Sequence, residues 1–569
     1  MCGSAILLLM TLALLENVEC FKPSVYPAYC SESGSDQEIN SAARQIPALS
    51  VSERDLVDQL MQVQVMIRHG ARTPYDALQC WKDYAVRWDD CNVTQLVLPS
   101  DKDSGTVPDA PWLFRKLYDA SPDKLHGDCY TGQLIQEGYY QENELGKQFK
   151  ERYVGPGNST NGMHTLLETS VWEEMDKSRF YFRSTDLQRT LMSGQQFCYN
   201  FFEVTDETIV DWHTGDSSLD PLAPSYGSCP YLEQIDNEAY ADPDFIAANA
   251  SQSAALSDAL DAELGAGYWR WSSITDCFMT AVCTERDVPD SAGYMNDSLF
   301  NAAVEQGQFS YFHKMGYNNS EWPKLGMSDT LYKVLTLTPT LILDLILVLT
   351  PTHPKVRTNA EEAILRGSEE NYKKLVLLSA HDTSVIPYVD ALLGSNGPMD
   401  WWAPYASYVT LELYNATDGR HWFRAIYNGE PLQLEGCPAI TGDSTGLCDA
   451  AIVLEQTLGY AEENGGDRCQ QPVTSTSGGD VDDNQKDRTD GGSDDSLGIS
   501  PGGLVGIILL SILVGAIGAN QIVKSDFFHS WCSSRGTAYD ASGAGTPDGE
   551  PETNPLRYAD HSSGRRSEL

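Results

Sequence analysis

The stretch RHGARTP at residues 68–74 directly follows an apolar run, Leu60 to Ile67, with the composition of a strand. Two arginines and a histidine therefore fall close together at the end of a predicted strand. Arginine guanidinium groups match the geometry of phosphate oxygens and stay charged at every working pH. A histidine between them can attack a phosphorus atom or bind one of its oxygens. An isolated Arg-His-Gly would more often be a basic surface loop, but the complete stretch predicts a phosphate pocket.

Two later segments repeat the order of strand, polar turn and helix. They are RFYFRSTD at residues 179–186 and LVLLSAHDT at residues 375–383. This alternation is typical of α/β proteins, in which ligands bind at the carboxyl ends of strands. The sequence therefore predicts that side chains distant in the chain converge there, namely those of Arg68, His69, Arg183, His381 and Asp382.

The pattern changes between about residues 211 and 326. This region contains a helix-like stretch, Ala247 to Leu264, rich in Ala, Asp and Leu, and an aromatic cluster at residues 268–271. It is predicted to be a smaller, mainly helical insertion that covers the site.

The ends of the chain differ from the middle. Residues 5–15 are almost continuously apolar, which is typical of a secretory signal peptide, and residues 502–523 are uncharged and of transmembrane length. Basic residues follow that second segment, so the tail is expected in the cytosol. The predicted order is a signal peptide at 1–20, a lumenal domain at 21–472, a disordered Ser/Gly/Asp-rich stalk at 473–501, a transmembrane helix at 502–523 and a cytoplasmic tail at 524–569.

The charge and the cysteines agree with a secreted catalytic region. The net charge of −43 disfavours nucleic acid as a partner, because phosphate backbones require a basic surface. Fourteen cysteines in a secreted context indicate disulfides rather than a metal site. Short spacing favours Cys277–Cys283, Cys80–Cys91 and Cys437–Cys448, while Cys30 is either left odd or pairs with Cys20. Glycosylation sequons begin at Asn92, Asn158, Asn249, Asn296, Asn318 and Asn415.

Taken together, Arg68-His69-Gly-x-Arg72-x-Pro74, Arg183-Ser-Thr-Asp-x-x-Arg189-Thr and His381-Asp382-Thr383 resemble the histidine acid phosphatase branch of the histidine phosphatase superfamily. The resemblance extends from about Leu60 to Cys469. The Arg-His-Gly triplet alone would indicate only the superfamily, which also contains phosphoglycerate mutases. The resemblance implies a phosphoglycerate mutase-like α/β sandwich.

The resemblance also implies a role for each site residue. His69 is the nucleophile that takes the phosphoryl group, and Asp382 is the general acid that protonates the leaving alcohol. The phosphate oxygens are held by Arg68, Arg72, Arg183 and His381. Arg189 is interpreted as a structural ion-pair partner, and no metal or cofactor is expected. Because Asp382 must be protonated to donate, an acidic optimum is expected.

The same resemblance bears on the remaining cysteines. Cys229–Cys469 is similar to a long-range family pairing, which leaves Cys129–Cys198 by elimination. Mammalian members place a bridging cysteine where this chain has Tyr408, so the insertion is expected to be tied differently here.

Three functions follow as hypotheses. The first is a membrane-anchored acid phosphatase of broad phosphomonoester specificity, in lysosomes, endosomes or the plasma membrane, compatible with a homodimer. The second is a specialised phosphatase acting on lysophosphatidate, phytate or a sugar phosphate, although His-Asp-Thr rather than His-Asp-Asn disfavours phytate. The third is an inactive receptor-like ectodomain, which predicts the loss of at least one catalytic residue, and all are present.

Overall fold

The computed structural model describes residues 19–24, 30, 45–75, 80–91, 96–97, 114–115, 123–155, 164–203, 210–331, 373–416, 418–464 and 468–469. The predicted stalk, transmembrane helix and cytoplasmic tail lie outside these residues, as do residues 1–18 of the predicted signal peptide. Within the described part of the chain, no helix has the length and apolarity that a bilayer span requires.

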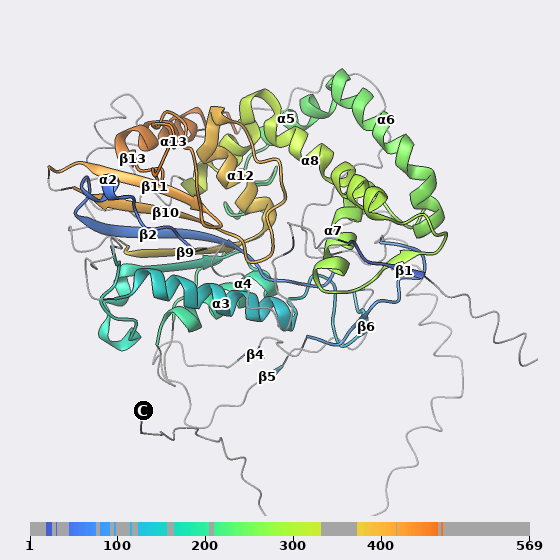
Figure 1. Ribbon diagram of the computed structural model, residues 1–569, viewed down its shortest axis with the longest axis horizontal. Helices are drawn as coiled ribbons and strands as arrows, with labels where there is room; N and C mark the ends of the chain where they lie inside the picture. The colour runs from blue at the N-terminus through green and yellow to red at the C-terminus, as the bar shows by residue number, and fades with distance from the viewer. Residues whose placement is uncertain are drawn as a thin grey trace, which may run out of the picture. The chain divides into compact units, whose positions relative to one another are not determined.

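A seven-stranded mixed sheet forms the centre of the described region (Figure 1). Its strand order is β12–β11–β10–β2–β9–β7, and β13 pairs with β11. The neighbours β2 (Gln59–Arg68), β9 (Leu375–Ala380) and β7 (Phe180–Ser184) run parallel. The antiparallel part comprises β10 (Tyr408–Asn415), β11 (His421–Tyr427), β12 (Glu430–Pro431) and β13 (Cys448–Asp449). The parallel strands end at one edge, as the sequence predicts.

Helices cover both faces of this sheet (Figure 1). Leu375 and Leu377 of β9 face a cluster shared with α3 (Gln136–Tyr153) and α4 (Gln188–Phe201). Val376 and Leu378 face the opposite cluster, shared with α12 (Asp382–Leu393) and α13 (Ala450–Asn464). Because β9 is buried on both faces, it is a continuous apolar run rather than an alternating one.

The predicted insertion is mainly helical. It contains α5 (Tyr231–Tyr240), α6 (Pro243–Leu260), a π-helical turn (Asp261–Gly265), α7 (Trp271–Cys283) and α8 (Asp297–Gly326). The expected helix at 247–264 starts four residues earlier, because Asp242 caps it by accepting from the backbone N–H groups of Asp244 and Phe245. Helix α8 is interrupted at Tyr317–Ser320, where the backbone is not helical.

Smaller elements complete the described chain. They are β1 (Glu19–Phe21) paired with β8 (Val288–Asp290), β3 (Arg87–Trp88) with β6 (His126–Gly127), β4 (Leu96–Val97) with β5 (Phe114–Arg115), the helix α2 (Val51–Arg54), and 3₁₀ turns at Trp172–Glu174, Lys177–Arg179 and Gly394–Asn396. The predicted signal boundary at residue 20 falls inside β1, which pairs with the insertion.

Five disulfides occur among the described cysteines. Cys229–Cys469 and Cys437–Cys448 are the pairs expected from the sequence. The other pairs differ from expectation and are Cys30–Cys283, Cys80–Cys277 and Cys91–Cys129. Cys198 is a buried free thiol on α4, so its predicted pairing with Cys129 is wrong.

The expected Cys277–Cys283 pair is excluded by the helix that carries both residues. Cys277 and Cys283 both lie on α7, where six residues of helical rise separate them by about 9 Å, beyond the reach of a disulfide. Each instead bonds to a segment outside the helix, Cys80 or Cys30. The insertion is therefore tied to the chain on either side of the first motif.

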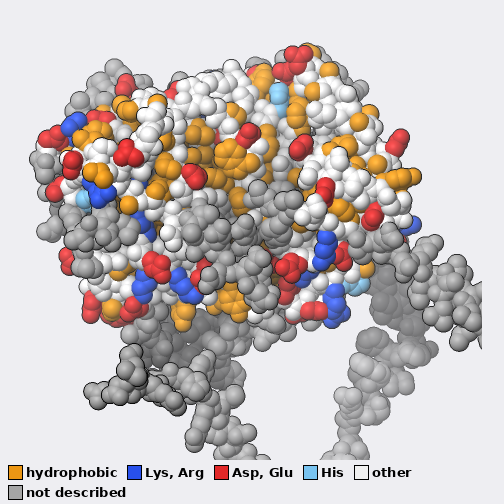
Figure 2. All heavy atoms as spheres, in the orientation of Figure 1, with side chains coloured by type: hydrophobic (Ala, Val, Ile, Leu, Met, Phe, Trp, Pro, Cys, Tyr) orange, Lys and Arg blue, Asp and Glu red, His pale blue; other side chains and the backbone are white. Residues whose placement is uncertain are grey.

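Four of the predicted sequon asparagines lie in the described chain. Asn296 and Asn318 are exposed, whereas Asn249 and Asn415 are partly buried. Asn92 and Asn158 lie outside the described residues. On the face shown in Figure 2, acidic side chains are spread over the surface and basic ones are fewer, in keeping with the net charge of −43.

A buried acid on α12 predicts how stability depends on pH. Asp390 is fully buried, its Oδ1 accepts from the Met399 backbone N–H at 2.7 Å, and burial raises its pKa to about 8. The fold therefore favours the protonated acid. The stabilisation is complete below the unfolded pKa near 3.8 and is lost as the pH rises towards 8.

Asp390→Asn keeps the shape of the side chain and removes this titration. We expect the free energy of unfolding of the native protein to fall between pH 5 and 7.5 by up to ~1.4 kcal/mol per pH unit more than that of the variant. Chemical unfolding at the two pH values measures the difference. Asp400→Asn, at an exposed position nearby, is the matched control. Equal pH dependence in native protein and Asp390→Asn would contradict the argument.

Candidate active site

The register of the parallel strands brings the three predicted segments together. Arg68 at the end of β2 lies opposite Ala380 at the end of β9, and the His69 backbone N–H donates to the Ala380 carbonyl at 3.0 Å. On the other side of β9, Ser184 lies opposite Ser379. The predicted convergence at one sheet edge is therefore confirmed for the segments that carry the motifs.

One ring nitrogen of His69 is held by the backbone. Its side chain is buried, and Nδ1 lies 2.8 Å from the Gly70 carbonyl oxygen. A carbonyl can only accept, so Nδ1 carries the hydrogen and the lone pair of the neutral ring is on Nε2. Burial and the charges of Arg189, Arg68, Arg72 and His381 hold the pKa of His69 well below its usual value. These surroundings therefore favour the neutral imidazole.

Gly70 permits the chain to turn directly after this histidine. A Cβ at this position would lie 2.2 Å from the backbone oxygen of Gly138 in α3. The Gly70 N–H donates to Ser193 Oγ of α4 at 3.1 Å, and the Ala71 N–H donates to Gln141 Oε1 at 2.8 Å. The close approach of the first motif to α3 thus requires glycine, and these hydrogen bonds hold the motif against the two helices.

The two arginines of the first motif are buried and have anionic partners. Arg68 Nη2 lies 2.8 Å from Asp382 Oδ2, and its guanidinium stacks 4.2 Å from the centre of the Tyr405 ring. Arg72 Nη1 lies 2.9 Å from Asp276 Oδ1. Although burial alone would lower the pKa of Arg72, Asp276 holds it above the usual value. Both guanidinium groups are therefore fixed cations in the site.

Asp382 begins α12 and is surrounded by hydrogen-bond donors. Its Oδ1 accepts from the Thr383 N–H at 2.8 Å, and its Oδ2 accepts from Trp402 Nε1 at 3.0 Å as well as from Arg68. Burial alone would raise the pKa of Asp382, but the charges of Arg68, Arg72 and His381 lower it. These charges favour the ionised carboxyl, whereas a bound phosphate would favour its protonation.

His381 lies beside His69. The ring centres of His69 and His381 are 5.5 Å apart, with the rings at 73°. His381 Nε2 is 2.9 Å from Thr185 Oγ1, which links the third motif to the second.

The two arginines of the second motif have different surroundings in the structure. Arg183 Nη2 pairs with Asp220 Oδ1 at 2.9 Å. Arg189, in the first turn of α4, is buried and acts electrostatically on His69. A Cβ at Gly132 would lie 3.2 Å from Arg189 Nη1, and the Gly132 N–H bonds to the Pro74 carbonyl of the first motif. Arg183 therefore has an ion-pair partner, and Arg189 lies beside the segment that packs on the first motif.

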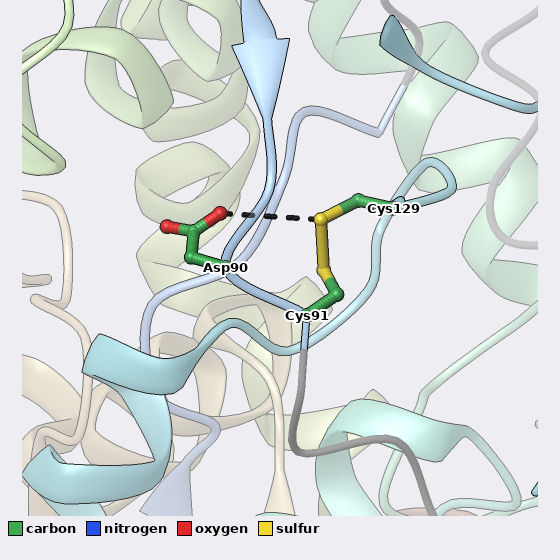
Figure 3. A group of neighbouring side chains, drawn as sticks. All are labelled: Asp90, Cys91 and Cys129. Carbon is green, nitrogen blue, oxygen red and sulfur yellow. Dashed lines mark hydrogen bonds between the residues drawn. A yellow bond between two sulfur atoms is a disulfide. The ribbon is translucent and has the colours of Figure 1, made fainter. Parts of the chain in front are cut away.

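One cluster has side chains of the types that bind metals. Asp90, Cys91 and Cys129 lie close together, as Figure 3 shows. The two sulfurs form a disulfide, so they offer no thiolate ligands. This cluster is therefore structural.

Comparison with known proteins agrees with the geometry. The model of the histidine phosphatase superfamily (branch 2) matches residues 59–428. Counting factor 60 of Dictyostelium discoideum is 27% identical over 422 residues, which are 72% of this chain and 88% of that protein. Lysosomal acid phosphatase of Rattus norvegicus is 26% identical over 324 residues, 54% of this chain and 66% of the relative. Lysophosphatidic acid phosphatase type 6 of Bos taurus is 24% identical over 410 residues, 70% of this chain and 82% of the relative.

Among solved structures, a phytase of Hafnia alvei covers 73% of this chain and 99% of its own, at 13% identity and a TM-score of 0.41. The family model spans most of the chain and includes the segments that meet at the sheet edge. The chain therefore belongs to branch 2 of the histidine phosphatase superfamily, and it is a phosphatase.

Proposed function

We propose that this chain is an acid phosphatase that hydrolyses phosphate monoesters through a phosphohistidine intermediate. The observation that carries the proposal is the unprotonated Nε2 of the His69 ring, which lies among buried arginines that include Arg68, the partner of the Asp382 carboxyl. Fixed guanidinium groups supply the charge stabilisation that phosphoryl transfer needs. A covalent intermediate divides the hydrolysis into two easier steps.

The proposed hydrolysis has two steps, and each forms one bond to phosphorus and breaks another. In the first, the lone pair of His69 Nε2 forms a bond to phosphorus, the bond to the ester oxygen breaks, and protonated Asp382 gives its proton to that oxygen. In the second, water attacks phosphorus, Asp382 takes the proton of the water, and the N–P bond breaks. Inorganic phosphate leaves, and both residues return to their starting states.

The pH dependence follows from these states. Because the pKa of His69 is lowered, the nucleophile stays neutral as the solution becomes acidic. Asp382 must be protonated for the first step, which requires acid. Hydrolysis of an aryl phosphate by the full chain should therefore be greatest below pH ~6 and should not require an added metal. Activity that is absent over the whole acid range would overturn the proposal.

We further propose that Arg189 takes the phosphate-binding role that the sequence suggested for Arg183. Arg189→Ala should lower kcat/KM by ~10²–10³-fold, because it removes a fixed donor to developing charge. Arg183→Ala should have a much smaller effect on kcat/KM but should lower stability, since it leaves the fully buried Asp220 without this ion pair. Kinetics and thermal unfolding of both variants measure the two effects. A larger kinetic loss in Arg183→Ala would reverse the assignment.

The arrangement of the whole chain is also a proposal. The apolar segment at 502–523 and the apolar start of the sequence support a type I membrane protein with the site in the lumen or outside the cell. The lysosomal relative supports an acidic compartment. Protease protection of the full chain in intact vesicles tests this topology: the catalytic region should be protected and the tail cleaved.

A specialised substrate is the second candidate. The lysophosphatidic acid phosphatase relative supports it, and the carboxylate of Asp276 beside Arg72 disfavours polyanionic substrates such as phytate. Comparing kcat/KM for lysophosphatidate, phytate, a sugar phosphate and an aryl phosphate distinguishes broad from narrow specificity.

A further inference from the structure

The segment at residues 402–405 surrounds the ion pair of Arg68 and Asp382. The Ala403 carbonyl accepts from Arg68 Nη1 at 2.6 Å, and the Tyr405 ring lies 4.2 Å from the Arg68 guanidinium. Trp402 Nε1 donates to Asp382 Oδ2 at 3.0 Å. One short segment thus contacts both members of the pair.

The ring of Trp402 is in turn packed against the insertion. Tyr311 and Phe312 of α8 lie with their ring centres 5.1 and 6.1 Å from that of Trp402. Aromatic contacts of this kind fix the plane of an indole and therefore the direction of its N–H. The insertion is consequently connected to Asp382 through the side chain of Trp402.

The two oxygens of Asp382 are not equivalent. Oδ2 accepts from the cationic Arg68 and from Trp402, whereas Oδ1 accepts from the neutral backbone N–H of Thr383. A proton on Oδ2 would disrupt a charge-assisted contact and the indole bond together. A proton on Oδ1 disturbs one neutral hydrogen bond, which costs less.

We propose that Trp402 is a positioning residue that keeps Asp382 Oδ2 as an acceptor, so that the proton given to the leaving group is on Oδ1. The inference rests on the proposed role of Asp382 as proton donor. When the P–O bond breaks, the leaving oxygen forms an O–H bond with the Oδ1 proton. The electron pair of the old Oδ1–H bond stays on the carboxylate, which Arg68 and Trp402 stabilise.

This role predicts that replacement of Trp402 affects substrates unequally. Alkyl leaving groups need the proton in the transition state, whereas an aryl group such as p-nitrophenolate leaves without it. Trp402→Phe keeps a ring but removes the N–H. It should lower kcat/KM for glycerol phosphate about tenfold, while the loss for p-nitrophenyl phosphate stays below about twofold.

The pH profile gives a second measurement. The charged and titratable groups that face Asp382 are Arg68 at the end of β2, Arg72 after it, His381, Tyr311 of α8 and Tyr405. Trp402→Phe leaves all of them in place. Because the indole N–H favours the carboxylate, its removal should move the alkaline limb of kcat for glycerol phosphate to higher pH.

The experiment compares five forms of the full-length protein. These are the native chain, Trp402→Phe, the exposed neighbour Trp401→Phe as control, Asp382→Ala, and Trp402→Phe with Asp382→Ala. Trp402→Phe should lose activity selectively on glycerol phosphate, Trp401→Phe should behave as the native chain, and the double variant should match Asp382→Ala. Equal losses on both substrates, or an additional loss in the double variant, would overturn the inference.

The variants also distinguish a failure of this inference from a failure of the proposed function. If Trp402→Phe does not fold, Tyr311→Leu provides a second test, because it removes the ring contact with Trp402 but keeps the indole N–H. Its loss of kcat/KM should be smaller and should again be greater for glycerol phosphate than for p-nitrophenyl phosphate. Equal losses on the two substrates would again overturn the inference. If Asp382→Ala itself shows no preference between the substrates, the proposed proton donor is wrong. If Asp382→Ala shows the preference and Trp402→Phe does not, only the role of Trp402 is wrong.

Discussion

His69→Ala is expected to abolish phosphate-ester hydrolysis, with a fall in kcat of at least ~10⁴-fold, the size of loss found when a covalent nucleophile is removed. The reason is geometric. Nδ1 is committed to the Gly70 carbonyl, so Nε2 is the ring atom that presents a lone pair, and alanine provides no replacement. Steady-state hydrolysis of p-nitrophenyl phosphate at acid pH measures the loss.

Trapping the intermediate makes this test specific for mechanism. The native chain mixed briefly with labelled substrate and quenched in alkali should retain label on His69, because phosphohistidine resists base, and His69→Ala should retain none. His126→Ala, at an exposed position on β6, is the matched control and should behave as the native chain. Label at another residue, or substantial turnover by folded His69→Ala, would contradict the phosphohistidine mechanism.

The sequence could predict the location of the site because the relevant signals are local. Each motif lies at the end of an apolar run, and parallel strands end at a common edge. His69, Arg68 and Asp382 follow from that rule, and the structure places Arg68 and Asp382 in direct contact. Strand ends are fixed by hydrophobic pattern, which a single sequence shows plainly.

The contacts that complete the site could not be predicted in the same way. Asp276 and Trp402 reach it from distant segments, and no local pattern shows that an acid on α7 will pair with Arg72. The choice between Arg183 and Arg189 depends on which way each side chain points. Arg183 pairs with Asp220, whereas Arg189 lies in the first turn of α4 and acts electrostatically on His69.

The disulfides illustrate the same limit. Cys437–Cys448 joins a loop residue to β13 across a sequence separation of 11 residues and is predictable from spacing. Cys80–Cys277 spans 197 residues and depends on the position of α7 against the segment that follows the first motif. Asp276 precedes Cys277, so the disulfide and the ion pair with Arg72 hold the same turn of α7 beside the site. Only the three-dimensional arrangement shows that the Cys80–Cys277 disulfide and the Asp276–Arg72 ion pair act on the same turn.

The second large effect concerns stability rather than catalysis. Glu412 of β10 is completely buried and lies between two buried arginines. Its Oε2 accepts from Arg424 Nε at 2.7 Å and from the Tyr414 hydroxyl at 2.8 Å. Its Oε1 accepts from Arg152 at 3.1 Å and from the Tyr153 hydroxyl at 2.8 Å. The Glu412 carboxylate therefore neutralises Arg424 of β11 and Arg152 of α3, and it connects the antiparallel strands to that helix.

The contribution of Glu412 to stability depends on pH. Burial alone would raise the pKa of Glu412, but Arg424 and Arg152, with the two tyrosine hydroxyls, lower it below 4.5. A carboxyl with a lowered folded-state pKa stabilises the fold above the unfolded value, and that contribution is lost only as the pH falls through the folded value. The network is therefore intact under the mildly acidic conditions at which the enzyme is proposed to work.

Glu412→Ala should lower the free energy of unfolding by about 3–5 kcal/mol, because it leaves two buried guanidinium groups without their counter-ion. Arg424→Met should cost less, since Glu412 keeps Arg152 as a partner and the methionine fills apolar space. Asp418→Ala, which breaks an exposed pair with Arg420 between the same strands, should leave the unfolding midpoint unchanged. Chemical unfolding at pH 6 ranks the three variants. Equal destabilisation by Glu412→Ala and Asp418→Ala would show that water reaches the pair, and that the buried charges of β10 and β11 do not hold the sheet against α3.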